Sequence, residues 1–158
     1  MHLQESKRIL RQSNLFCDLN DIHLDLVLMV CEEISYREGE YIFHQNDPGD
    51  ALYIIVRGEV DILVEPSDNS DAAPIRVATS KENDTFGEIL LVDQGERSAS
   101  ARCKTDTQLL RISRDRLLKL CYDYPEIGFH IMHRIAAELA LKLRSSNQGL
   151  RQQLFPQS

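Results

Sequence analysis

Residues 86–101 have the sequence FGEILLVDQGERSASA, which combines several features suited to holding a phosphate group. Gly87 lacks a Cβ, so a ligand can approach its backbone closely. The apolar run 89–92 is long enough for about one or two helical turns, and the unpaired N–H groups at the start of a helix favour an anion. Arg97 adds a guanidinium group that can bind phosphate through paired N–H donors, and Ser98 adds a hydroxyl. The segment therefore predicts a site for one phosphate.

Glu88 does not fit a site for phosphate alone, because its carboxylate would repel the anion. It needs a different partner on the same ligand, and a sugar hydroxyl can donate a hydrogen bond to it. A phosphate beside a sugar hydroxyl is typical of a nucleotide. The alternative is that Glu88 and Arg97 are ordinary surface residues on a fold that no longer binds a ligand.

The same segment resembles the phosphate-binding cassette of the cyclic nucleotide-binding domain family, which occurs in catabolite-activator-type regulators, cyclic-nucleotide-dependent kinases and gated channels. The resemblance implies that Glu88 binds the ribose 2′-hydroxyl and that Arg97 binds the cyclic phosphate. Ser98 and the amides of a short cassette helix would complete the phosphate site. The positions that the resemblance assigns to ligand binding are Phe86, Gly87, Glu88, Ile89, Leu90, Arg97, Ser98 and Ala99.

The resemblance extends over about residues 15–143 and implies the fold. We expect an α+β domain, mainly β, built on an eight-stranded antiparallel β-roll (a double-stranded β-helix or jelly roll). Helices would precede the roll, one short helix would lie in the cassette and two helices would follow. The predicted domain spans residues 1–146, with residues 147–158 as a polar tail, and the chain is expected to fray beyond Ser145.

Local patterns place the individual elements of this fold. A first helix is expected over about residues 4–11, and Asn20 or Asp21 is expected to cap a second helix that reaches Cys31. Strands are expected at 34–36, 40–43, 52–56, 59–64, from 75, and at 100–103 and 109–112. The alternation in 59–64 predicts that Val60, Ile62 and Val64 face the core. The turn at 46–50 would use Gly49 for a positive φ.

The C-terminal part predicts two helices. Ser113 is a suitable N-cap for a helix over 114–122, and Pro125 suits the first turn of the last helix. Apolar residues then recur every four positions, at Ile127, Ile131, Ile135, Leu139 and Leu143. Such a seam can cover the pocket, pair with a second copy of the helix, or do both. A homodimer through residues 126–146 is therefore one candidate assembly.

Composition narrows the class of protein. The chain has 158 residues, 42% hydrophobic and 27% charged, as in an ordinary globular domain. Its net charge of −7 argues against direct binding to nucleic acid, which depends on neutralised phosphates. No apolar run approaches the roughly 20 residues needed to cross a bilayer, and residues 1–8 lack the core of a secretory signal. We expect a cytoplasmic protein without a membrane partner.

Metal binding and catalysis find little support in the sequence. The four cysteines are scattered without a Cys-x-x-Cys pair and are expected to be free buried thiols. His130 and His133 lie three residues apart but lack a third ligand, so no metal is expected. No catalytic motif is present. We also expect Arg97 to hold Glu88 ionised, which would make Glu88 unsuitable as a general acid.

The resulting hypothesis is a cyclic nucleotide sensor, not an enzyme, that responds to ligand by closure of its last helix and signals to an unidentified effector protein or across a homodimer. Cyclic AMP is expected as the ligand in preference to cyclic GMP. Lys142 and Leu143 fall where activator-type relatives offer hydroxyls to the base, with Ser145 and Ser146 nearby, so base selectivity stays open. One alternative is a ligand-free scaffold of the same fold. Another is the sensor fragment of a larger transcription regulator, whose winged helix-turn-helix is not found here.

Overall fold

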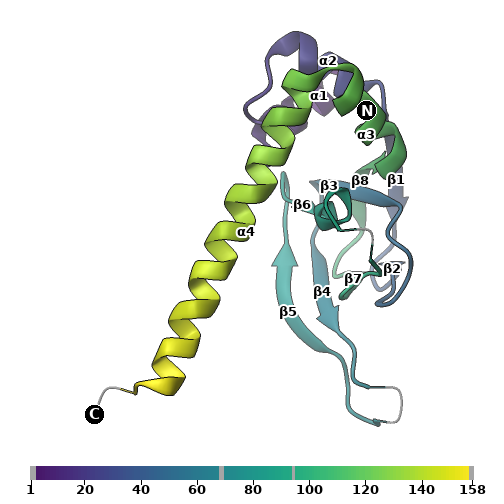
Figure 1. The fold of residues 1–158 in the computed structure, drawn as a ribbon. Helices are drawn as coiled ribbons and strands as arrows, with labels where there is room; N and C mark the ends of the chain where they lie inside the picture. The colour runs from purple at the N-terminus through teal and green to yellow at the C-terminus, as the bar shows by residue number, and fades with distance from the viewer. Residues whose placement is uncertain (1–2, 68–69, 94, 157–158) are drawn as a thin grey trace.

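Two four-stranded antiparallel sheets form the body of the molecule in the computed structural model, which describes residues 3–67, 70–93 and 95–156 (Figure 1). The first sheet has the order β1-β8-β3-β6, with bounds Cys31–Tyr36, Thr107–Ser113, Ala51–Arg57 and Thr85–Phe86. The second has the order β2-β7-β4-β5, with bounds Tyr41–Phe43, Ser100–Cys103, Val60–Val64 and Ile75–Ser80. The eight-stranded roll expected from the sequence is confirmed.

Strand β3 lies at the centre of the packing because it contributes to two cores. Its residues alternate in direction, as expected for a strand. Leu52, Ile54 and Val56 pack with the helices on one face of the first sheet. The residues between them point into the roll, where they pack with side chains from the second sheet. Burial on both faces explains why β3 is an unbroken apolar run and not an alternating one.

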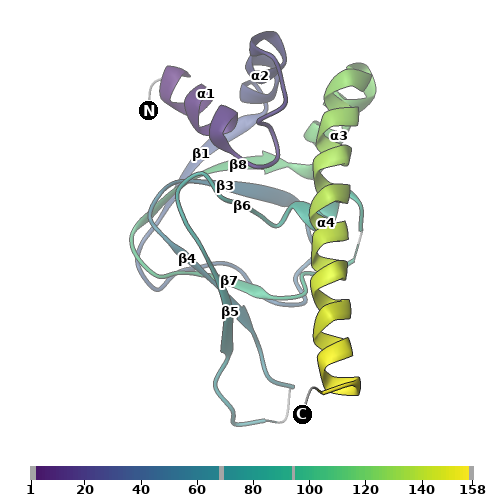
Figure 2. The ribbon, with the colours of Figure 1, turned by 90° about the vertical axis from the view of Figure 1, so that its left-hand side faces the viewer.

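The N-terminal helices α1 (Leu3–Gln12) and α2 (Asp21–Leu28) lie over the β1–β8–β3 side of the roll (Figure 2). The side chain of Asn20 accepts a hydrogen bond of 2.8 Å from the backbone N–H of His23, so the predicted N-cap is confirmed. The expected extension of this helix to Cys31 is wrong. Helix α2 ends at Leu28, and Cys31 pairs with Ile112 as the first residue of β1.

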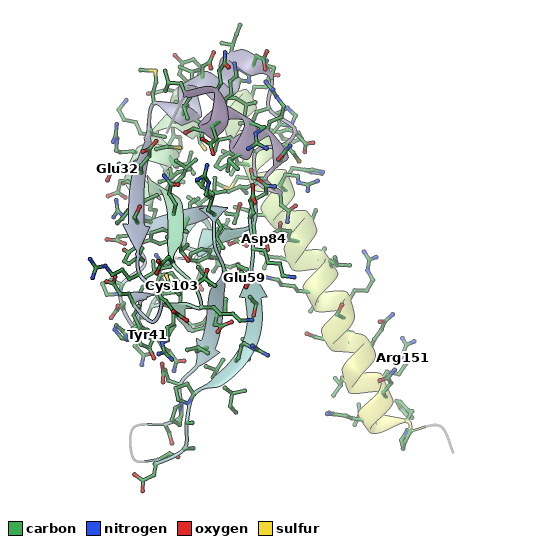
Figure 3. The ribbon with its side chains drawn as sticks, turned by 180° about the vertical axis from the view of Figure 1, so that it is seen from behind. Glu32, Tyr41, Glu59, Asp84, Cys103 and Arg151 are labelled. Atoms are coloured by element: carbon green, nitrogen blue, oxygen red, sulfur yellow. The ribbon has the colours of Figure 1, made fainter. Side chains whose placement is uncertain are left out.

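Two helices follow the roll, as expected. Helix α3 (Arg114–Asp123) begins after Ser113, whose hydroxyl accepts a hydrogen bond from the N–H of Arg116 at 3.5 Å. Helix α4 (Pro125–Leu154) starts against the other helices and then runs past the sheets. Its distal part, which carries Arg151, extends away from the roll (Figure 3). None of the helices that the structure describes is long and apolar enough to span a membrane.

The expectation that the chain frays after Ser145 is wrong, because α4 continues to Leu154. Good helix formers such as Gln, Leu and Arg fill most of this last stretch. The predicted apolar seam is only partly buried: Ile127, Ile131 and Ile135 are 0–1% exposed, whereas Leu139 is 38% and Leu143 is 63% exposed.

Two local details also differ from the sequence pattern. The alternation in β4 breaks after Ile62, so that Leu63 is buried and Val64 is 40% exposed; at the same point β5 has one extra residue, Val77, in its pairing with β4. In the 46–50 turn the positive φ belongs to Asn46, at 75°, and not to Gly49. Asn tolerates this left-handed conformation better than most residues. Gly49 is needed for space, since a Cβ there would lie 3.2 Å from the Cβ of Leu90.

Candidate functional site

Gly87 turns the chain from β6 into η1 (Glu88–Leu91), a single turn of 3₁₀ helix. Its φ of 78° lies in the left-handed region, where glycine is favoured. A Cβ at this position would lie 2.6 Å from Nη1 of Arg97. The sequence predicted that Gly87 lets a ligand approach closely. In the structure, the group that approaches its backbone is the guanidinium of Arg97.

Arg97 is 7% exposed, which is unusual for an arginine. Its Nη2 donates to the carbonyl oxygen of Ala51 at the start of β3. Nη1 donates to the carbonyl oxygen of Gly87 at 3.3 Å, and the guanidinium carbon lies 4.1 Å from the centre of the Phe43 ring. The backbone N–H of Arg97 is held by the carbonyl of Asp47 at 2.8 Å. Three separate segments of the roll therefore fix this cation.

One donor of Arg97 has no partner. Its Nε is buried and makes no hydrogen bond within the described residues. Burial is also the main reason that the pKa of Arg97 lies below its ordinary value. A buried, charged N–H without an acceptor costs on the order of 1–3 kcal/mol, so the site favours a group that supplies one. An anion with more than one oxygen fits this requirement.

Glu88 opens η1, and its carboxyl group faces α4. Glu88 is partly buried, and Glu138 and Lys142 of α4 lie near enough for their charges to act on its carboxyl. Burial raises the pKa of Glu88; the charge of Glu138 raises it further, and that of Lys142 opposes the shift. The expectation that Arg97 holds Glu88 ionised is wrong, because the guanidinium is directed to the carbonyls of Ala51 and Gly87.

Some of the other predicted site residues are buried and support the segment, and others lie on the surface. Phe86 is buried, and its ring stacks on that of Tyr53 at 5.3 Å. Leu90 is also buried, and its carbonyl oxygen accepts a hydrogen bond of 2.9 Å from Nε of Arg114. Ile89 and Ser98 are exposed, and Ala99 is partly covered. The structure therefore brings Gly87 and Arg97 into contact, with Glu88 directly after Gly87, while Phe86 and Leu90 anchor this segment.

Two residues of the site were not predicted from the sequence. Phe43 was assigned only to a strand, and nothing in its local pattern indicated a contact with Arg97. Glu138 was not singled out either, although it lies three residues after Ile135 and so falls on the face of the last helix that points to the roll. That spacing is the feature of the sequence that could have indicated Glu138.

The cysteines and histidines lie outside this site. All four cysteines are free. Burial raises the pKa of Cys31 to about 12 and that of Cys121 to about 11, so these thiols stay protonated. Cys17 is exposed, contrary to the expectation of buried thiols. His130 and His133 contact the ring of Phe129, and residues 3–67, 70–93 and 95–156 contain no group of three or more potential metal ligands.

Comparison with known proteins finds relatives of this chain. The family model described as "Cyclic nucleotide-binding domain" matches residues 33–124. The chain is 34% identical over 141 residues to the cyclic AMP receptor protein of Thermus thermophilus, which is 89% of this chain and 62% of that protein. The chain thus spans less than two thirds of that relative's length.

Solved structures of similar fold include the N-terminal domain of a transcriptional regulator from Streptomyces coelicolor. It has a TM-score of 0.74 and 26% identity, and the match covers 89% of this chain and 95% of that one. The regulatory domain of Toxoplasma gondii PKA, crystallised with cAMP, matches with a TM-score of 0.67 and 26% identity over 75% of this chain and 44% of that one.

Proposed function

This chain belongs to the cyclic nucleotide-binding domain family, and on that premise we propose that it is a sensor that binds cyclic AMP at residues 86–99 and responds through α4. Glu88 and Arg97 would hold the two polar parts of the ligand. The remaining predicted positions would shape the segment between them.

The unpaired Nε of buried Arg97 is the observation that carries this proposal. A cyclic phosphate has two oxygens outside its ring, and one of them would supply the missing acceptor. Gly49 supports the assignment. It has no Cβ, so the space 3.8 Å from Nε that a Cβ would occupy stays open. A hydrogen bond between charged groups contributes about 1.5–3 kcal/mol, which corresponds to roughly a ten- to hundredfold change in affinity.

Glu88 supplies the second half of the proposed recognition. Its carboxylate would accept a hydrogen bond from the ribose 2′-hydroxyl, while Ser98 and the amides near Gly87 would contact the phosphate. The preference for cyclic AMP over cyclic GMP rests on two named relatives, the Thermus receptor and the Toxoplasma domain crystallised with cAMP. Lys142 of α4 lies near enough for its charge to act on Glu88 and is one candidate to meet the base.

The output would pass through α4. Its buried residues end at Ile135, while Leu139 and Leu143 stay exposed on the same seam. Movement of this helix over the bound base would change the surface that residues 126–146 offer to a second copy or to an effector protein. A cytoplasmic location belongs to the same proposal, since free thiols are typical of a reducing compartment.

A ligand-free scaffold is the second candidate, and one observation favours it. Nη1 and Nη2 of Arg97 already donate to the carbonyls of Gly87 and Ala51, so this residue also has a structural role. An arginine retained only for these contacts would need no phosphate.

Calorimetric titration with cyclic AMP and cyclic GMP decides between the two candidates. The protein is first unfolded, washed and refolded to remove any carried-over nucleotide. We expect binding by the wild-type chain and a ten- to hundredfold loss for Arg97→Lys, which keeps a positive charge but lacks Nε. Arg102→Lys is the matched control, because Nε of that exposed arginine donates to the carbonyl of Gly39 at 3.1 Å. No heat with either nucleotide would favour the scaffold, and equal affinity of wild type and Arg97→Lys would refute the site.

A further inference from the structure

Arg114, the first residue of α3, connects this helix to the segment that carries the candidate site. Its Nε donates to the carbonyl oxygen of Leu90 in η1, and its backbone N–H donates to the carbonyl oxygen of Asp50, each at 2.9 Å. Its Nη1 lies 3.2 Å from the carboxylate of Asp115, and its side chain is 19% exposed. Carbonyls at the end of a helix need donors from outside it, and Arg114 supplies one to η1. One residue therefore joins η1, the start of α3 and the turn before β3.

Arg97 joins the same two segments at the other end of η1. Its Nη1 donates to the carbonyl of Gly87, the residue before η1, and its Nη2 donates to the carbonyl of Ala51. The carbonyls that Arg114 binds lie three residues after Gly87 and one residue before Ala51. Arg97 thus holds the end of η1 beside the proposed phosphate, and Arg114 holds the end beside α3.

The hydrogen bond from Arg114 adds direction to an otherwise apolar contact between η1 and α3. Leu90 and Leu91 are buried in one core with Leu117 and Leu120 of α3. Apolar burial is non-directional, whereas a hydrogen bond weakens steeply when its distance or angle changes. The contact of Arg114 therefore defines the position of η1 on α3 more narrowly than the packing of the leucines does.

Helices α3 and α4 are packed too closely to shift independently at their junction. Gly128 of α4 is buried, and a Cβ on it would lie 3.0 Å from the carbonyl oxygen of Cys121 and 3.1 Å from its Cβ. The connection is also short: Tyr124 donates to the carbonyl of Leu120 and accepts from the N–H of Ile127, each at 2.9 Å. Because such packing leaves little free space, a shift of α3 is carried into the start of α4.

We infer that Arg114 is a positioning residue that couples the nucleotide site to the C-terminal helices. The inference rests on the proposed function, because it needs a ligand that acts on residues 86–99. A phosphate bound at Arg97 acts on the first end of η1, while Arg114 keeps the second end attached to α3. Displacement of η1 therefore pulls on the first turn of α3, and the close packing at Gly128 carries the shift into α4.

Hydrogen exchange in the ligand-free protein tests the contact itself. The backbone N–H groups of Val92 and Asp93 both donate to the carbonyl of Ile89, so their exchange, measured by NMR, reports on the order of η1. We expect Arg114→Met to increase these exchange rates roughly tenfold, because the hydrogen bond from a charged donor is lost. Arg114→Lys, whose amine can still donate to the carbonyl of Leu90, should restore most of the protection.

Arg102→Met is the matched control. Nε of Arg102, in β7, donates to the carbonyl of Gly39 at 3.1 Å, so this variant loses the same kind of hydrogen bond within the second sheet. Its exchange in η1 should match that of the wild type. Unchanged exchange of Val92 and Asp93 in Arg114→Met would refute the positioning role, whether or not a cyclic nucleotide binds.

The coupling is measured by hydrogen exchange and mass spectrometry with and without saturating cyclic AMP. In the wild type and in Arg102→Met, we expect the nucleotide to change exchange over residues 86–99 and over residues 114–135. In Arg114→Met the first change should remain and the second should largely disappear, and Arg114→Lys should recover it. A residue that only stabilised the fold would leave the change over 114–135 in place, and that result would overturn the coupling. If exchange in the ligand-free variants behaves as expected but the wild type binds neither cyclic nucleotide, the proposed function is refuted and the coupling with it.

Discussion

Nη1 of Arg97 lies 3.3 Å from the carbonyl oxygen of Gly87, the residue whose φ of 78° starts the turn into η1. The conformation of the turn and the position of the cation therefore depend on each other. A side chain at Gly87 would both strain the backbone and collide with the guanidinium, at 2.6 Å.

We expect Gly87→Ala to lower the free energy of unfolding by about 1–2 kcal/mol, because a left-handed conformation is costly for a residue with a Cβ. Nucleotide affinity should fall as well, since the guanidinium must move. Urea denaturation and calorimetry measure the two effects. Gly149→Ala is the control: its Cβ would have no neighbour within 4 Å, and alanine in a helix should stabilise slightly. Equal stability of the Gly87→Ala variant and wild type would contradict the geometry.

Phe43 stabilises Arg97 through the face of its ring, which lies 4.1 Å from the guanidinium carbon. Because this cation is buried, we expect a coupling energy between the two residues of about 0.5–2 kcal/mol. A double-mutant cycle with Phe43→Leu and Arg97→Gln, followed by urea denaturation, measures it. The matched pair is Tyr41 and Arg102, whose guanidinium lies at 5.8 Å and is exposed. A coupling no larger than that of the exposed pair would mean that Phe43 does not hold the cation.

Much of this arrangement follows from sequence patterns that act over a few residues. The family resemblance carried by Gly87, Glu88 and Arg97 predicted the roll and the position of the cassette, while alternation and the Asn20 cap predicted individual strands and a helix. Each of these features depends on neighbours in the chain or on a glycine that a turn requires. The approach of Glu138 and Lys142 to Glu88 does not, because it depends on the path of α4 past the roll. No local pattern specifies that path, and the same is true of the contact between Phe43 and Arg97.

Strand β4 shows why a local pattern can also mislead. Strict alternation placed Val64 with Val60 and Ile62 on the buried side, but Leu63 is buried and Val64 is exposed, beside a bulge at Val77 of the neighbouring strand β5. We expect Leu63→Asn to cost about 2–4 kcal/mol of unfolding free energy, as a polar group replaces a buried apolar one. Val64→Asn should cost less than about 1 kcal/mol. If Val64→Asn cost more than Leu63→Asn in urea denaturation, Val64 and not Leu63 would be the buried residue.

Thiol reactivity reports on the burial of the cysteines. Burial raises the pKa of Cys31 to about 12 and that of Cys121 to about 11, and it also raises the pKa of Cys103. At about pH 8 Cys31 and Cys121 hold almost no thiolate, the form that reacts, and buried Cys103 holds less of it than an ordinary cysteine. We therefore expect a thiol reagent to modify Cys17 quickly and the others only after unfolding. Cys17→Ser should abolish the fast phase, and a fast phase that survives would contradict the burial of the remaining thiols.

The seam of α4 separates residues that stabilise the domain from residues that stay available to a partner. Ile135 is 1% exposed and Leu143 is 63% exposed, although both continue the same four-residue repeat. In dilute protein, Ile135→Ala is expected to cost about 2–4 kcal/mol of unfolding free energy through a cavity, and Leu143→Ala less than about 0.5 kcal/mol. Urea denaturation at low and high protein concentration measures both. A cost for Leu143→Ala that appears only at high concentration would indicate self-association through this seam, because binding to a second copy stabilises the folded chain by mass action. A large cost at every concentration would instead mean that Leu143 packs within its own domain, against the exposure seen in the structure.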